Sequence, residues 1–200
     1  MKAKPEHRAK GAEPLRRADA QRNMEALLKA ALAVFTKSGV DAPVRDIAEK
    51  AGVGVGTVYR HFPQRSDLIV AVFRQEVDAC ADAAAELAAK YPPVEALSRW
   101  TQRFTQFVAA KRGLAAALHS GDPAYEPLPA YYDAKLRPAL AMLLKRAVDA
   151  GEIRAGVAPG DLLSATVSLC RTPYDASPDH TQRMLALLID GLRYGAGKPK

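Results

Sequence analysis

The sequence has few of the residues that metal centres and disulfide frameworks require. Its 200 residues include two cysteines, four histidines and one tryptophan, and aromatic residues make up only 6%. Cys80 and Cys170 lie far apart in apolar segments, so we expect buried free thiols in a reducing compartment rather than a disulfide. Because no group of histidines and cysteines has metal-ligand spacing, we expect no metal and no cofactor.

Long apolar runs and catalytic motifs are also missing. No stretch of about 18 apolar residues occurs, and the basic N-terminus lacks the apolar stretch of a secretory signal. We therefore expect a cytoplasmic protein with no membrane partner. The sequence contains neither a nucleophile-elbow G-x-S-x-G nor a Walker loop, and its carboxylates are scattered. These absences indicate that the chain is not an enzyme.

Positive charge is concentrated in the first third of the chain. Residues 1–65 hold 13 Lys and Arg against 7 Asp and Glu, a net of +6, whereas residues 66–200 hold 16 against 15, a net of +1. This asymmetry favours a polyanion-binding end followed by a neutral remainder. A solvated basic tail on an unrelated fold would give the same pattern, so charge alone leaves both interpretations open.

The hydrophobic pattern divides the chain into three parts. Residues 1–17 are basic and aperiodic, and we expect a flexible arm there that attracts phosphates without reading sequence, minor-groove entry being the alternative. Residues 18–65 begin with a helix from about residue 19 to residue 37, which Gly39 ends. A short helix follows, with Asp41 or Ala42 as its cap and Pro43 in its first turn, and it ends at Gly52. Residues 66–200 contain further helices.

The segment Val55–Phe62 predicts a short helix with two different sides. At about 100° per residue, one side carries Val55, Val58 and Phe62, with Tyr59 on its flank. The other side carries Gly56, Thr57, Arg60 and His61. Two short helices joined by a tight glycine turn, the second with a polar outer face, are typical of a helix-turn-helix. A helical hairpin with a merely solvated polar face is the alternative; a dinucleotide loop is disfavoured, because no strand precedes the glycines.

The stretch "VRDIAEKAGVGVGTVYRHFPQRSDLI" resembles the DNA-binding domain of the tetracycline-repressor (TetR/AcrR) family, and "LLKAALAVFTKSGV" before it resembles the first helix of that family. The segment "LLIDGLR" near the C-terminus resembles the last helix of one large subgroup of the family. The resemblance is strong over about residues 20–75 and weaker beyond. It implies an all-α fold of about nine helices, with an N-terminal helix-turn-helix domain and a C-terminal effector-binding and dimerisation domain. It also implies a bacterial homodimer that binds a palindromic double-stranded DNA operator, most often as a repressor, sits at the nucleoid when bound, and is released by a small-molecule effector.

The resemblance implies that Thr57, Tyr59 and His61 contact DNA, and that Arg65 lies near a phosphate at the start of the fourth helix. Arg60 occupies a variable position of the family, and arginine pairs bidentately with guanine in the major groove, so we expect it to set specificity. Gly56 allows the backbone a close approach. The expected DNA-contacting residues are Arg16, Arg17, Arg45, Gly56, Thr57, Tyr59, Arg60, His61 and Arg65.

Residues 66–200 carry the candidates for effector binding. An aromatic set at helical spacing either fills the core or lines a cavity, since ligand pockets are mostly apolar with a few polar groups. The expected ligand-binding residues are Trp100, Phe104, Phe107, His119, Tyr131 and Arg171.

The last helix, near residues 179–194, is apolar almost all round, which favours burial against a two-fold partner over a core helix of one subunit. The expected dimer-interface residues are Leu162, Val167, Cys170, Leu185, Leu188 and Leu192. A helical scaffold that binds no DNA remains the third class of function, and salt-dependent DNA binding separates it from a regulator.

Overall fold

The fold is built from helices alone. A computed structural model describes the backbone of residues 12–170 and 179–194, and the side chains from residue 21 onward. Within these residues there are nine α-helices, two 3-10 turns and no strand, which confirms the predicted all-α class. The elements in order are α1 (Ala12–Ser38), α2 (Val44–Ala51), α3 (Val55–His61), α4 (Arg65–Lys90), α5 (Pro93–Lys111), η1 (Arg112–Leu114), α6 (Ala115–Leu118), η2 (Pro123–Tyr125), α7 (Leu128–Asp149), α8 (Pro159–Leu169) and α9 (His180–Arg193).

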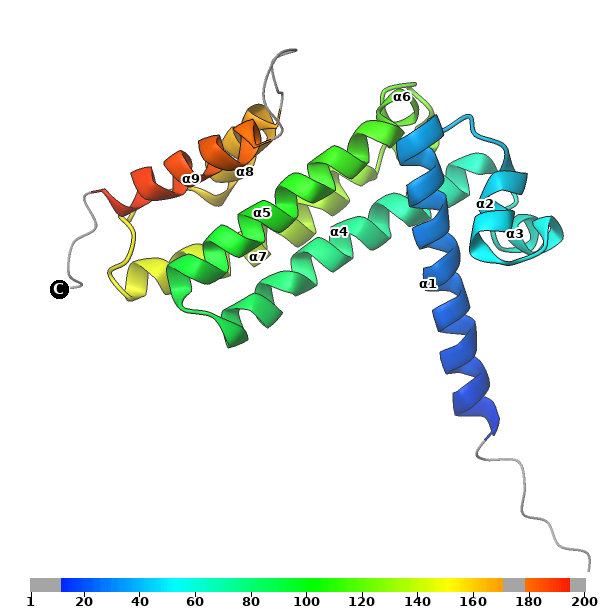
Figure 1. The fold of residues 1–200 in the computed structure, drawn as a ribbon, viewed down its shortest axis with the longest axis horizontal. Coiled ribbons are helices and arrows are strands. Elements are labelled where there is room, and N and C mark those ends of the chain that lie inside the picture. The colour runs from blue at the N-terminus through cyan, green and yellow to red at the C-terminus, as the bar shows by residue number, and fades with distance from the viewer. Residues whose placement is uncertain (1–11, 171–178, 195–200) are drawn as a thin grey trace, which may run out of the picture.

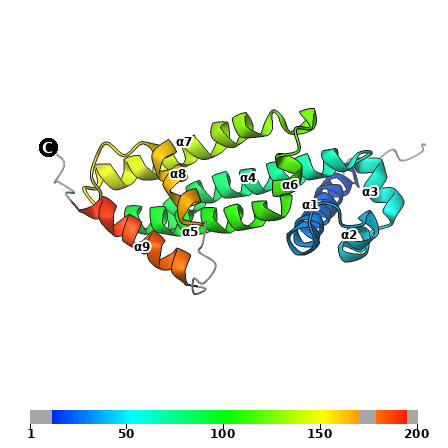
Figure 2. The ribbon, with the colours of Figure 1, turned by 90° about the horizontal axis from the view of Figure 1, so that it is seen from above.

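Three long helices form the body of the molecule. Helices α4, α5 and α7 run side by side, and α1, α2 and α3 gather at one end around the start of α4 (Figures 1 and 2). Helices α8 and α9 lie against α5 and α7 away from that end. The long helices bury apolar stripes at helical spacing, including Val77, Leu97 and Leu140, all fully buried. The α2–α3 hairpin is thus held at the tip of a packed bundle.

The first helix starts earlier than the sequence pattern predicts. Helix α1 begins at Ala12, so residues 12–17 of the expected arm are helical. The physical reason is composition: Ala, Glu, Leu and Arg favour helix, and Pro14 falls in the first turn, where its missing N–H costs no hydrogen bond. The predicted DNA contacts of Arg16 and Arg17 concern side chains outside the described residues.

Glycines end the first two helices, as predicted. Gly39 and Gly52 have φ angles of +78° and +68°, the left-handed conformation that only glycine adopts without strain. The expected start of α2 was wrong, because Pro43 precedes the helix as its N-cap and no side chain caps it. Gln64 and Asp67 cap α4 reciprocally, a feature that the sequence reading missed; the Gln64 N–H donates to the Asp67 carboxylate at 2.9 Å.

Candidate nucleic-acid interface

A tight turn fixes α3 against α2. The Gly52 N–H donates to the Glu49 carbonyl at 3.1 Å, and the Val53 N–H donates to the Ala48 carbonyl at 3.0 Å. Val58 is the anchor of α3, with 1% of its surface exposed among buried side chains of α1, α2 and α4. Val58 within the helix and Phe62 at its end thus hold the seven-residue helix against the core.

The outer face of α3 is largely exposed to solvent. Gly56, Arg60 and His61 are exposed, and Tyr59 keeps 52% of its surface in solvent. The Arg60 guanidinium donates to the hydroxyl of the half-buried Thr57 at 3.3 Å, which holds it along the helix surface. These groups can donate to phosphates and base edges without disturbing the core.

Val55 departs from the expected pattern. It was placed on the apolar side of α3 with Val58 and Phe62, yet it is 37% exposed. The reason is its position at the first residue of the helix, where the chain has just turned at Gly54 and no other helix covers it. Phe62 is half-buried and packs against the core, as expected.

Gly56 is not required by the packing of the subunit. A β-carbon built on it would meet no heavy atom of the chain within 4 Å, and its φ angle is not positive. Gly56 is the second residue of α3, and glycine in a helix costs up to about 0.5–1 kcal/mol relative to alanine. The chain therefore keeps an unfavourable residue on the exposed face, at a point where the backbone of α3 is open to a close approach from outside.

Arg65 has a structural role that the sequence reading missed. Its Nη1 donates to the carbonyls of Val40 and Ala42, at 2.8 Å for Ala42, and so ties the α1–α2 turn to the start of α4. These partners lie 25 and 23 residues away, beyond the reach of any local pattern. The expected phosphate contact of Arg65 stays a prediction. Arg45 on α2 is exposed, as a DNA-facing residue must be.

Comparison with known proteins identifies the chain's family. Residues 27–72 match the family model described as bacterial regulatory proteins, tetR family. Residues 92–194, half of the chain, match the model described as transcriptional regulator SbtR-like, C-terminal domain. The chain belongs to the TetR family. It is a DNA-binding transcriptional regulator, and the family consists of regulators rather than enzymes.

Solved structures of regulators share most of the fold of this TetR-family chain. The TetR transcriptional regulator SCO0520 from Streptomyces coelicolor is 39% identical, with a TM-score of 0.74 over 84% of this chain and 97% of that one. A TetR regulatory protein from Mycobacterium vanbaalenii is 34% identical, with a TM-score of 0.69 over 88% and 98%. An HTH-type transcriptional regulator of Staphylococcus aureus strain USA300 is 36% identical over 63 residues, and this chain spans 34% of the length of such curated relatives.

The TetR-family chain packs three of its predicted ligand residues into an aromatic cluster. Trp100 and Phe104 are fully buried and stacked with ring centroids 5.6 Å apart, and Phe104 stacks on Phe107 at 5.9 Å. The indole N–H of Trp100 donates to the Cys80 carbonyl at 2.8 Å. Burial raises the pKa of the Cys80 thiol to about 12, which keeps it protonated. Trp100 and Phe104 fill the bundle interior, and ligand contact by them stays a prediction.

The other predicted ligand residues lie apart from this cluster. His119 is exposed, and its Nδ1 lies 2.7 Å from the Ala115 carbonyl. The Tyr131 hydroxyl donates to the Asp78 carboxylate at 2.7–2.8 Å and so links α7 to α4. Arg171 lies outside the described residues. The structure therefore does not bring His119 and Tyr131 to the Trp100 cluster.

The predicted dimer residues are mostly buried inside one subunit. Leu162, Cys170, Leu185 and Leu192 are each at most 4% exposed, so the expectation that a partner must cover them was wrong. The reason is that α8 and α9 turn one apolar face onto α5 and α7, which periodicity cannot distinguish from an interface. Leu188 is half-buried and Val167 is 37% exposed.

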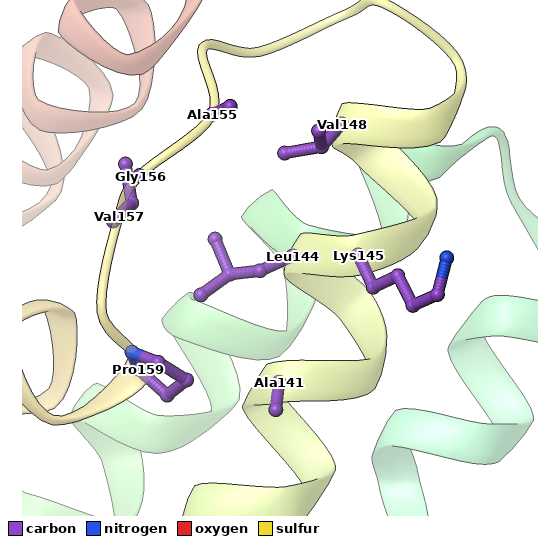
Figure 3. Close-up of a pocket in the computed structure, with 8 residues that line it drawn as sticks. All are labelled: Ala141, Leu144, Lys145, Val148, Ala155, Gly156, Val157 and Pro159. Atoms are coloured by element: carbon purple, nitrogen blue, oxygen red, sulfur yellow. The ribbon is translucent and has the colours of Figure 1, made fainter.

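Several cavities open where α8 and the segment before it meet the bundle. One of about 300 Å³ lies between α7 and residues 155–159, with Leu144 facing that segment and Lys145 pointing away from it (Figure 3). Lys145 is ion-paired with Asp149 at 2.6 Å. A second cavity, of about 190 Å³, lies between α5 and α8. Among the described residues, no group of histidines, cysteines and carboxylates is arranged to hold a metal, and no helix is long and apolar enough to cross a membrane.

Proposed function

We propose that this TetR-family regulator is a homodimeric repressor that binds a palindromic operator with α3 of each subunit and is released by a small-molecule effector. The observation that carries the proposal is the outer face of α3, where Gly56, Tyr59, Arg60 and His61 are exposed on a helix anchored by Val58. A dimer bound at an operator occupies DNA that transcription needs, which is the physical basis of repression.

The residues of this face take different roles. Arg60 reads a base, because its guanidinium matches the O6 and N7 acceptors of guanine. Tyr59 and His61, together with Arg45 of α2, bind phosphates and set the register of α3 on the duplex. The bare backbone at Gly56 lets α3 sit deep in the major groove. The basic first third of the chain adds a salt-dependent attraction that does not depend on sequence.

Dimerisation uses a side of α9 that the subunit covers only in part. Met184, Leu187, Leu188 and Gly191 recur at steps of three and four, and none of the four is fully buried. Leu187 is 63% exposed, unusual for a leucine on a structured helix, and a β-carbon on Gly191 would meet nothing within 4 Å. We assign this apolar stripe, rather than Leu185 and Leu192, to the dimer interface.

An effector response is proposed by comparison. LfrR of Mycobacterium smegmatis, 26% identical with a TM-score of 0.63 over 90% of this chain and 99% of that one, was solved in complex with proflavine. That finding belongs to LfrR alone, and it shows that this fold accommodates a small organic molecule. In the present chain, the cavities beside α8 are the candidate sites for such a molecule.

Selection of bound duplexes from a random-sequence pool tests the proposal. The purified chain should enrich two inverted half-sites with centres separated by about one helical turn, ~34 Å. Sedimentation of the chain with the enriched duplex should give two chains per duplex. Enrichment of single unpaired sites, or equal retention of all duplexes at moderate salt, would refute the proposed mode of binding. Transcription from a promoter that carries the enriched site then distinguishes repression from activation.

A further inference from the structure

The hydroxyl of Thr57 is used differently from those of four other helical threonines. Each of the four donates to a backbone carbonyl three or four residues earlier in its own helix: Thr36, Thr101, Thr105 and Thr166. The Thr57 hydroxyl instead accepts a hydrogen bond from Nη2 of Arg60, at 3.3 Å. Bonding back to the helix is a common use of a threonine hydroxyl, so its bond to an exposed arginine sets Thr57 apart.

Arg60 in turn differs from other arginines on exposed helix faces. Arg99 pairs with the Glu95 carboxylate at 2.7 Å, one turn earlier in α5. Arg137 pairs with the Asp133 carboxylate at 3.0 Å, one turn earlier in α7. The partner of Arg60 is also one turn earlier, but it is a neutral hydroxyl, and within the described part of the chain no carboxylate pairs with Arg60. The guanidinium is therefore held while its full positive charge remains available to DNA.

The bond to Thr57 also determines which part of α3 carries this charge. Arg60 lies in the last turn of α3, whereas Thr57 lies in the first. Because side chains on a helix point back towards its N-terminus, this bond draws the guanidinium towards the first turn. The N-terminal residues of a recognition helix are the ones that reach base edges in the major groove. Gly56, whose backbone is exposed, lies in the same turn.

We propose that Thr57 is a positioning residue for base recognition, because its hydroxyl holds the Arg60 guanidinium in the orientation that reads a guanine in each half-site. The inference rests on the proposed reading of a base by Arg60 and adds the residue that prepares it. An unheld arginine loses rotamer freedom when it binds, and a bond made before DNA arrives reduces that loss. A guanidinium has five N–H donors, so a bond to Thr57 leaves enough for the O6 and N7 acceptors of guanine.

The test compares Thr57→Val and Thr57→Ser in the full chain. Valine keeps the branched shape of threonine but cannot accept a hydrogen bond, whereas serine keeps the hydroxyl. Each protein is titrated against the duplex that the wild type selects from a random pool, and against duplexes in which each pair of symmetry-related base pairs is replaced in turn. Thr57→Val should lose about threefold to tenfold of discrimination at the base pair that Arg60→Ala identifies, and should keep the wild-type pattern elsewhere. Thr57→Ser should keep the whole wild-type profile.

Two further variants isolate the action of Thr57 through Arg60. Thr105→Val controls for the loss of a helical hydroxyl, because Thr105 is also half-buried and bonds to the Gln102 carbonyl on α5; it should bind all the duplexes as the wild type does. The double variant Thr57→Val/Arg60→Ala should discriminate at that base pair as Arg60→Ala alone does, since the hydroxyl then has no guanidinium to hold. Melting followed by circular dichroism checks that every variant is folded.

The outcomes separate the positioning role from the proposed function. If Thr57→Val weakens binding to every duplex equally, Thr57 contacts a phosphate, as the sequence resemblance implies, and the positioning role is overturned. An unchanged profile for Thr57→Val, an equal loss for Thr57→Ser, or a further loss in the double variant overturns it as well. In each of these cases base reading by Arg60 stands, provided that Arg60→Ala loses discrimination. If Arg60→Ala keeps the wild-type profile, the proposed base reading fails and the positioning role fails with it.

Discussion

The outer face of α3 is mostly exposed, whereas the aromatic cluster of Trp100, Phe104 and Phe107 on α5 is buried. On α3, Val58 is the one fully buried side chain, and Tyr59, Arg60 and His61 are exposed to solvent. In the cluster, every ring is buried inside the subunit. Trp100 has no exposed surface, and its indole N–H donates to the Cys80 carbonyl. Residues that the fold does not use are the ones left free to recognise a partner, so exposed chemistry is the better guide to function in this molecule.

Replacing Trp100 should produce the largest effect on stability. Trp100→Ala removes a fully buried ring that stacks on Phe104 and bonds to the Cys80 carbonyl, and we expect a loss of about 3–5 kcal/mol in the free energy of unfolding. Trp100→Phe keeps a ring and should cost less. Thermal or urea unfolding measures both. Equal stability of Trp100→Ala and wild type would mean that the bundle interior is not packed as described.

A charge placed on the apolar stripe of α9 should weaken DNA binding more than it destabilises the folded subunit. Leu187→Arg adds a charge at an exposed position, so the subunit should stay folded while the dimer dissociates and operator affinity falls about hundredfold or more. Ala186→Arg is the matched control, because Ala186 is exposed, lies about 100° around the helix from Leu187 and is not part of the stripe. Sedimentation, circular dichroism and operator titration on one sample test this. A dimeric Leu187→Arg variant would exclude Leu187 from the interface.

Replacing Arg65, at the start of α4, should affect stability, whereas replacing the exposed Arg45 of α2 should affect DNA binding. Arg65→Met should lower the free energy of unfolding by about 1–3 kcal/mol, since the carbonyls of Val40 and Ala42 lose a charged donor. Arg45→Met, at an exposed position of α2, should leave stability unchanged and weaken DNA binding. Urea unfolding followed by circular dichroism measures the difference. Equal stability of the two variants would show that Arg65 does not brace the α1–α2 turn.

Replacing Gly56 should give the smallest effect: the subunit should become more stable, and operator binding should become weaker. Gly56→Ala should raise the free energy of unfolding by about 0.5–1 kcal/mol, because alanine favours helix and the chain leaves room for its β-carbon. The same methyl group should weaken operator binding by keeping α3 away from the groove. Differential scanning calorimetry and anisotropy measure the two effects. A variant that is more stable and binds the operator as tightly as the wild type would show that the backbone at Gly56 does not approach DNA closely.

Local pattern was enough to predict the helix-turn-helix, because its determinants are close in sequence. The period of three and four residues located the helices, and the glycine stops at Gly39 and Gly52 depend on single backbone angles. The exposure of Gly56, Arg60 and His61 followed from projecting one short helix. The same projection puts Val55 on the buried side, but its exposure depends on which neighbouring residues reach the first turn of α3.

Contacts across long separations could not be predicted. Periodicity shows that α9 has apolar sides, but it does not show which side the same subunit covers, so Leu185 and Leu192 were assigned to a partner. The brace from Arg65 to Val40 and Ala42, and the contact of Gly113 with the end of α1, join residues that only the folded chain brings together.

The most direct test of the central claim is a base-pair discrimination experiment with wild type and Arg60→Ala. Each protein is titrated against the selected operator and against duplexes in which each pair of symmetry-related base pairs is replaced in turn. The account predicts that Arg60→Ala loses about 1–3 kcal/mol of discrimination at one position of each half-site and keeps the wild-type pattern elsewhere. Identical discrimination profiles for the two proteins would contradict the claim that the exposed face of α3 reads the operator.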